Sequence, residues 1–170
     1  GLHYNWPAPI GEVYKPAVTR VNRVEIGYRS GTDFGRAAGV REVNAESLML
    51  TGDENIIDID VTVFWRIKDA GAYLFEIQRP DTTIKSVAES AMREVVGQTP
   101  LQFVLTEGRA RIEQQTRELI QATLDTYKSG VEVTRVRLQK VAPPQQVIDA
   151  FRDVQAARAD QERLQNEAEA

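Results

Sequence analysis

Between residues 55 and 67, apolar and polar residues alternate along the chain. Alternation with a period of two places successive side chains on opposite faces of a β-strand, so it predicts a long strand with one buried face. We expect the buried face to consist of Ile57, Ile59, Val61, Val63, Trp65 and Ile67. The other face, which we expect to lie against solvent, carries Asp58, Asp60, Thr62 and Arg66, with Ile56 and Phe64 as apolar exceptions.

Shorter strands are predicted before this one. Residues 18–28 alternate in the same way, and 40–44 and 47–51 are long enough for short strands. The glycine-rich stretch 30–39 is typical of a surface loop, and the residues at 51–54 are typical of a turn. Strands joined by short turns favour an antiparallel or mixed sheet.

Beyond Lys68 the apolar spacing becomes that of amphipathic helices. We expect a short helix at 69–77 and a second helix that begins with Asp81 as its N-cap and ends at Gly97. The second helix has an apolar face made of Ile84, Val87, Ala88, Ala91 and Val95. Its opposite face carries charged residues four positions apart, Lys85, Glu89 and Arg93.

Residues 99–102 read as a capping box with proline at the first helical position. A longer helix is expected at 106–127, with an apolar stripe of Ile112, Leu119, Ile120, Leu124 and Tyr127. The chain then returns to a strand at 131–141. Because its alternation shifts by one position in the middle, we expect a β-bulge near Thr134 or Arg135. Together these elements predict an α+β domain whose sheet is packed by helices.

After two prolines, residues 145–170 lack glycine and proline and are rich in helix-forming residues. The apolar positions thin out along this segment and include Val147, Ile148, Phe151, Val154 and Leu164. A long helix with so narrow an apolar stripe needs a partner helix, so we interpret 143–170 as the start of a coiled coil that mediates oligomerisation. A solvated single helix that frays is the alternative.

The first 17 residues hold three prolines and the aromatic residues Tyr4, Trp6 and Tyr14, which predicts an extended lead-in. Aromatic rings of this kind suit a membrane–water interface. From composition alone, packing of the rings on the domain edge is the favoured reading. The chain therefore divides into a lead-in at 1–17, a domain at 18–142 and a helix at 143–170.

Composition and net charge exclude some classes of function. A chain of 170 residues with a net charge of −4 has the size of one domain plus an extension and lacks the basic balance of a nucleic-acid binder. It has no cysteine, and no apolar run approaches the ~20 residues that cross a bilayer. Because it starts and ends inside recognisable patterns, we expect it to be a fragment of a longer protein.

No set of residues predicts a catalytic or metal site. The acidic residues Asp53, Glu54, Asp58 and Asp60 fit the solvated side of a strand better than a calcium or magnesium site. The chain has a single histidine, and a serine nucleophile could be imagined only at Ser86 beside Lys85. Sequence neighbours on a helix point in different directions, so we expect no catalytic residue, no metal and no cofactor.

Four stretches carry a resemblance to a known family. LMLTGDENIIDIDVTVFWRIKDAGAYLF is the most specific, and AESAMREVVGQTPLQFVLTEGRARI, GLHYNWPAPIGEVYK and the last strand with its helix support it. The whole chain resembles the SPFH (stomatin, prohibitin, flotillin, HflK/C) or band-7 family. Within this family, the stretch GDEN at residues 52–55 is most similar to the HflK branch.

The resemblance implies a fold and a role. HflK-like proteins have a single N-terminal membrane anchor, absent here, then this domain on the periplasmic side of the bacterial inner membrane, then a long helix. They assemble with HflC into rings or cages and modulate the ATP-dependent membrane protease FtsH. Self-association, HflC, FtsH and membrane lipid at the N-terminal side are thus the expected partners, and Tyr4, Trp6 and Tyr14 become candidates for contact with the membrane.

On this reading the chain is a subunit of a scaffold and has no catalytic role. In the assembly, the packed domains form a wall that limits which membrane proteins reach the protease. Without its anchor and most of its helix, we expect the chain to be monomeric or weakly associating. A stomatin-like organiser of the membrane that acts without FtsH is the first alternative, and a serine hydrolase is the second.

Overall fold

The computed structural model describes residues 15–30, 41–77, 79–106 and 108–144, and positions 154 and 161. Its centre is the strand β5 (Ile56–Ile67), which pairs along one edge with β6 (Val131–Ala142). The other edge of β5 is shared end to end by β4 (Leu48–Leu50) and β1 (Asn22–Ile26). Each of these pairings is antiparallel, which confirms the antiparallel form of the expected sheet.

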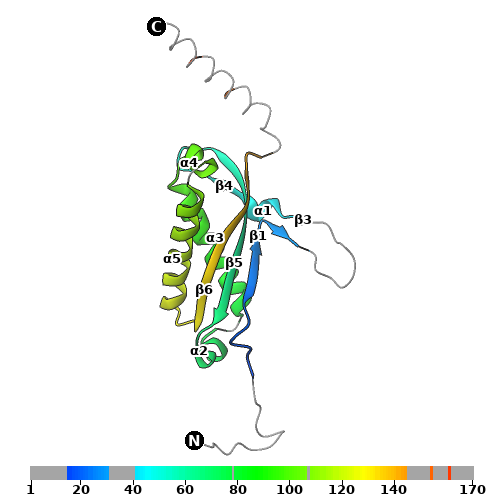
Figure 1. The fold of residues 1–170 in the computed structure, drawn as a ribbon, viewed down its shortest axis with the longest axis vertical. Helices are drawn as coiled ribbons and strands as arrows, with labels where there is room; N and C mark the ends of the chain where they lie inside the picture. Colours follow the sequence, from blue (N-terminus) through cyan, green and yellow to red (C-terminus); the bar gives the residue numbers. More distant parts are fainter. Residues whose placement is uncertain are drawn as a thin grey trace, which may run out of the picture.

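Two long helices, α3 (Pro80–Gly97) and α5 (Arg109–Thr126), lie together over one face of this sheet (Figure 1). The short helix α2 (Ala70–Phe75) follows β5, and α4 (Leu101–Leu105) joins the long helices. A four-residue helix, α1 (Asn44–Ser47), leads into β4. The strands β2 (Tyr28–Arg29) and β3 (Arg41–Glu42) form a separate small antiparallel sheet. The α+β class is therefore confirmed, with helices on one side of the main sheet.

The core lies between the sheet and the two long helices. All six residues predicted to form the inner face of β5 are buried, as expected. The helices cover them with a second layer that includes Ile84, Ala88, Ala91, Met92, Val95, Ile112, Ile120 and Leu124. Thr116 is also fully buried there, and its hydroxyl donates to the Sδ of Met92 at 3.4 Å. Tyr127, by contrast, is 56% exposed at the C-cap of α5, so the predicted apolar stripe is wrong at this last position.

Strand β6 contains the predicted bulge. Phe64 pairs with Arg135 and Trp65 with Val133, so Thr134 is the extra residue. A second bulge, which the sequence did not predict, places Gln139 as an extra residue between the partners of Asp60 and Val61. Each bulge adds one side chain to the face of β6 that points away from the helices.

The expectation of a fully solvated outer face on β5 was wrong at two positions. Asp60 and Thr62 are only 6% and 2% exposed. The hydroxyl of Tyr28 lies 2.5 Å from that of Thr62, and the backbone of Gly27 passes directly over Asp60. The turn between β1 and β2 thus covers this part of the sheet, a long-range contact that alternation within β5 cannot reveal.

Two predicted helix starts were also wrong. Arg79, not Asp81, is the N-cap of α3, because Pro80 already occupies its first turn. At α4 the Thr99 hydroxyl donates to the carbonyl of Val95, so no capping box forms.

The start of α4 is instead satisfied from a distant loop. The backbone N–H of Leu101 donates to Oδ1 of Asp53 at 2.9 Å. Hydrogen bonds from the Thr51 hydroxyl and then from this amide hold the pKa of Asp53 below its ordinary value. An acidic residue predicted to lie in a solvated turn therefore joins that turn to the helical layer.

Candidate interaction surfaces

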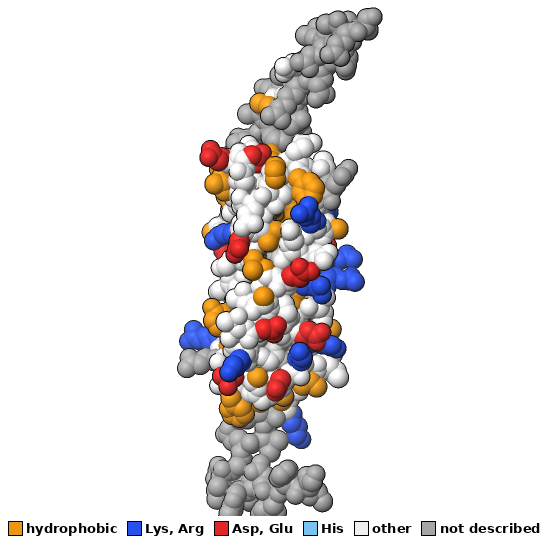
Figure 2. Space-filling view, turned by 90° about the vertical axis from the view of Figure 1, so that its left-hand side faces the viewer, with side chains coloured by type: hydrophobic (Ala, Val, Ile, Leu, Met, Phe, Trp, Pro, Cys, Tyr) orange, Lys and Arg blue, Asp and Glu red, His pale blue; other side chains and the backbone are white. Residues whose placement is uncertain are grey.

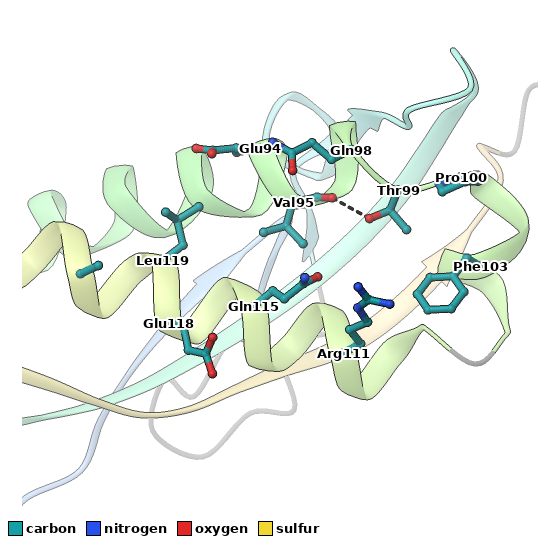
Figure 3. A pocket seen from close by; sticks show the side chains of 11 residues that line it. Glu94, Val95, Gln98, Thr99, Pro100, Phe103, Arg111, Gln115, Glu118 and Leu119 are labelled. Carbon is teal, nitrogen blue, oxygen red and sulfur yellow. Dashed lines mark hydrogen bonds between the residues drawn. The ribbon is translucent and has the colours of Figure 1, made fainter.

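A groove runs between the C-terminal half of α3, α4 and α5 (Figure 3). We call it the helix groove. It has a volume of about 730 Å³ and is lined by Glu94, Val95, Gln98, Thr99, Pro100, Phe103, Arg111, Gln115, Glu118, Leu119 and Ala122. Apolar side chains from all three helices form its interior, and charged side chains stand on its rims. It is therefore suited to a protein segment with apolar and charged groups, and it carries no evident catalytic arrangement.

The charged residues that line the helix groove differ in how far neighbouring side chains already engage them. The Arg111 guanidinium stacks on Phe103, 5.9 Å from the ring centroid, in a cation–π contact. Glu118 is exposed and accepts a hydrogen bond from Gln114 on the same helix. Glu94 is exposed on α3, where Figure 3 shows it on the opposite side of the groove from Glu118. Two carboxylates thus flank an apolar floor, and Figure 2 shows the mixed charges of this helical face.

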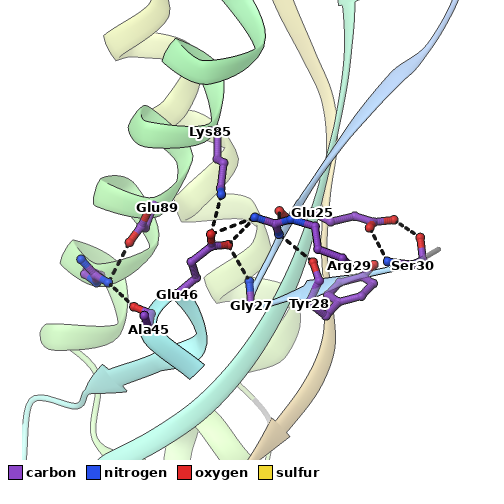
Figure 4. Close-up of polar contacts among 10 residues, drawn as sticks. Glu25, Gly27, Tyr28, Arg29, Ser30, Ala45, Glu46, Lys85 and Glu89 are labelled. Carbon is purple, nitrogen blue, oxygen red and sulfur yellow. Dashed lines mark hydrogen bonds and ion pairs between the residues drawn. The ribbon is translucent and has the colours of Figure 1, made fainter. Parts of the chain in front are cut away.

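A second feature is the cluster around Glu46 on α1 (Figure 4). Both carboxylate oxygens accept from the Arg29 guanidinium at 2.8 and 2.9 Å, and Lys85 Nζ lies 2.5 Å from Oε1. Burial opposes ionisation of this carboxyl, but the hydrogen bonds from Lys85 and Arg29 outweigh it and hold the pKa of Glu46 below its ordinary value. The cluster ties α1, β2 and α3 together, so we interpret it as structural. Of the three charged residues predicted on the outer face of α3, Lys85 belongs to this cluster. The other two, Glu89 and Arg93, form an ion pair with each other at 2.7 Å.

The third feature lies on the face of the main sheet that points away from the helices. It is a shallow depression of about 620 Å³ lined by Val21, Phe64, Thr134, Arg135, Arg137 and Gln139, which we call the open sheet face. Elsewhere on the same side, charged residues are paired: Arg66 with Glu132 and Lys140 with Asp58, both at 2.8 Å. Arg135 and Arg137 are exposed and have no ion pair or hydrogen bond within the described part of the chain.

Sequence reasoning missed these two arginines as candidate binding residues. The signal was present in the stretch VEVTRVRL, because Arg135 and Arg137 are two positions apart and so share one face of the strand, opposite the apolar Val136 and Leu138. The bulge at Thr134 is what places this face outward although Val133, two positions before Arg135, points inward. The bulge itself was predicted, but the outward-facing arginines that follow it were not.

The candidate residues named from the sequence fall mostly outside the described residues. Tyr4, Trp6 and Tyr14 do so, as do Val147, Phe151 and Leu164. Val154 is described and is helical, with 51% of its surface exposed. None of the described helices is both long and apolar enough to span a bilayer.

The residues considered for catalysis and metal binding are not brought together. Ser86 is exposed on α3, and its neighbour Lys85 is engaged by Glu46. Of the acidic residues, Asp53 bonds to the start of α4 and Asp58 pairs with Lys140. Within the described ranges, no group of three or more histidine, cysteine, aspartate or glutamate side chains could hold a metal ion.

Comparison with known proteins assigns the chain to a family. Residues 1–170 match the model of the SPFH domain / Band 7 family, and the chain belongs to that family. Curated proteins called Protein HflK are similar to it: that of Vibrio cholerae is 40% identical over 131 residues, 77% of this chain and 33% of the relative. That of Treponema pallidum is 35% identical over 169 residues, 98% of this chain and 51% of the relative.

A third relative, from Escherichia coli K12, is called Modulator of FtsH protease HflK and is 35% identical over 131 residues, 77% of this chain and 31% of that protein. These relatives confirm the predicted similarity to the HflK branch. The chain spans between about a third and a half of the length of these curated relatives.

Proposed function

We propose that this chain is the SPFH domain of a non-catalytic scaffold subunit that regulates the membrane protease FtsH. The observation that carries the proposal is the similarity to the Escherichia coli modulator of that protease, over 77% of this chain. In the proposed mechanism, copies of the subunit assemble with HflC at the bacterial inner membrane. The wall of packed domains then restricts which membrane proteins reach the enclosed protease.

Each part of the chain has a place in this proposal. The lead-in at 1–17 lies nearest the membrane on the periplasmic side, with Tyr4, Trp6 and Tyr14 at the lipid surface. The domain at 18–142 supplies the wall. The helix from 143 onward joins neighbouring subunits through Val147, Phe151, Val154 and Leu164, in the manner of a coiled coil.

The described side chains support a role without catalysis. The charged clusters connect elements of the fold: Glu46 joins α1, β2 and α3, and Asp53 joins a turn to α4. The side chains left free, on the helix groove and the open sheet face, are exposed and suited to protein contacts. A scaffold needs such surfaces and needs no group with an activated nucleophile.

Co-purification of the full-length protein from its own membranes in mild detergent tests the proposal. We expect HflC and FtsH to be recovered with it in one large particle. A self-assembled particle that contains no FtsH, even after chemical cross-linking in the intact membrane, would contradict the protease-regulating role and favour a stomatin-like organiser of the membrane.

A further inference from the structure

We propose that α5 closes the free edge of the main sheet with two side chains, Gln121 and Glu113, so that this edge cannot take up a further strand. β6 pairs with β5 along one edge, and within the described residues no strand pairs with its other edge. An unpaired edge presents backbone groups that can hydrogen-bond to a strand of another copy, which leads to aggregation. This role goes beyond the proposed function and belongs to the single chain.

Among the described strands of the main sheet, β6 has the longest free edge. It has 12 residues, whereas β1 and β4, which share the opposite edge of the sheet, have five and three. Short edge strands offer few backbone groups to a partner, but a strand of this length offers a full ladder. β6 is also rich in valine and lacks proline and glycine, so its own strand propensity is high. The edge of β6 therefore requires cover more than the opposite edge does.

Gln121 covers the first part of this edge. The helix α5 lies along β6 (Figure 1). The side-chain oxygen of Gln121 accepts a hydrogen bond from the N–H of Val133 at 2.8 Å, and its side-chain nitrogen donates to the carbonyl of Val131 at 3.2 Å. A residue in a neighbouring parallel strand would make the same two bonds with its backbone. One side chain thus occupies the place of a strand neighbour.

Glu113 covers the edge further along β6. Its Oε1 accepts a hydrogen bond from the N–H of Leu138 at 2.9 Å. Val133 and Leu138 are five residues apart, so in a regular strand their N–H groups would point to opposite edges. The bulge in β6 removes this mismatch, because the partners of these residues on β5, Trp65 and Val61, are four residues apart. Both N–H groups are therefore directed toward α5.

The spacing of the two side chains on α5 matches the spacing of the amides that they bind. Eight residues along a helix rise about 12 Å, and four residues along a strand rise about 13–14 Å. Glu113 and Gln121 are half-buried. The other long polar side chains of α5 are exposed, namely Arg109, Arg111, Gln114, Gln115, Arg117 and Glu118. The two half-buried side chains are thus directed at the sheet edge rather than at solvent.

Hydrogen exchange followed by NMR tests whether these side chains hold the edge. In the 170-residue chain, E113A/Q121A should speed exchange of the Val133 and Leu138 amides about tenfold, while exchange in the centre of β5 stays unchanged. Glu113→Gln keeps an oxygen that can accept a hydrogen bond, so it should protect Leu138 as wild type does. Unchanged exchange of both amides in E113A/Q121A would overturn the proposal.

Association provides the second measurement. E113A/Q121A should form oligomers that bind thioflavin T and increase with protein concentration, because β6 of one copy can then pair with β6 of another. Q115A/E118A removes the same two types of side chain from exposed positions on α5 and should behave as wild type. Ile112→Val weakens the core and leaves the edge covered, so it should not form these oligomers either.

The results separate closure of the edge from a simple loss of stability. The variants are compared at urea concentrations that unfold the same fraction of each. If Ile112→Val then associates as strongly as E113A/Q121A, loss of stability explains the association and the proposal is wrong. It is wrong as well if E113A/Q121A folds and associates no more than wild type. Should the double variant fail to fold, Gln121→Ala and Glu113→Ala are compared singly by the same criteria.

Discussion

Replacing Gly27 with alanine should destabilise the domain, because the turn that contains Gly27 lies directly on the strand that it covers. Gly27 has a φ of 89°, a region that costs a residue with a Cβ about 1–2 kcal/mol. A Cβ at this position would collide with Oδ1 of Asp60 and lie 2.9 Å from Cβ of Ser47 and 3.0 Å from the carbonyl oxygen of Ile59. Relieving such an overlap costs a further 1–3 kcal/mol or so. We therefore expect a loss of about 3 kcal/mol in the free energy of unfolding.

Urea unfolding followed by far-ultraviolet circular dichroism measures this loss, and thermal unfolding should show a decrease in Tm of roughly 10 °C. Gly97→Ala is the matched control. Its new Cβ would meet only the carbonyl oxygen of Leu50, at 3.9 Å, and alanine is favoured over glycine in a helix by about 0.5–1 kcal/mol. A Gly27→Ala variant as stable as wild type, or equal destabilisation of both variants, would refute the argument that the turn over Asp60 requires glycine.

Three other substitutions probe the remaining structural contacts. Glu46→Gln should lower stability by about 1–2 kcal/mol at pH 7, because it removes the charge that Lys85 binds. The folded-state pKa of Glu46 lies below its ordinary value of 4.5. The difference in stability between wild type and Glu46→Gln should therefore be complete above pH 4.5 and disappear as the pH falls through the folded-state pKa. Unfolding measured over a series of acidic pH values checks this. Asp53→Ala should speed hydrogen exchange of the Leu101 amide in NMR, and unchanged protection would contradict its role as the cap of α4. Thr116→Val should raise the free energy of unfolding by up to about 1 kcal/mol, because it removes a buried hydroxyl whose hydrogen bond within the described residues is to sulfur; a loss of stability in calorimetry would oppose this.

The sequence predicted those parts of the fold that local patterns decide. Alternation located β5 and its buried face, and the break in alternation located the bulge at Thr134. These signals depend on neighbours within one strand, so they can be read without knowledge of the fold.

The parts that were missed depend on contacts between distant segments. Asp53 lies 48 residues before Leu101, whose amide it binds, and Tyr28 is 34 residues from Thr62, whose hydroxyl it contacts. Neither contact can be predicted from the order of apolar and polar residues within one segment. The helix groove was missed for the same reason, because it combines side chains from three helices. The residues predicted to contact the membrane and the partner helix remain predictions.

The most direct test of the central claim is degradation by FtsH in reconstituted vesicles, with and without the full-length protein and HflC. One labelled substrate is an integral membrane protein and the other is a soluble protein supplied from the side of the protease domain. If the assembly restricts lateral access, degradation of the membrane substrate should slow while degradation of the soluble substrate stays unchanged. Equal slowing of both substrates would contradict the account and indicate direct inhibition of the protease.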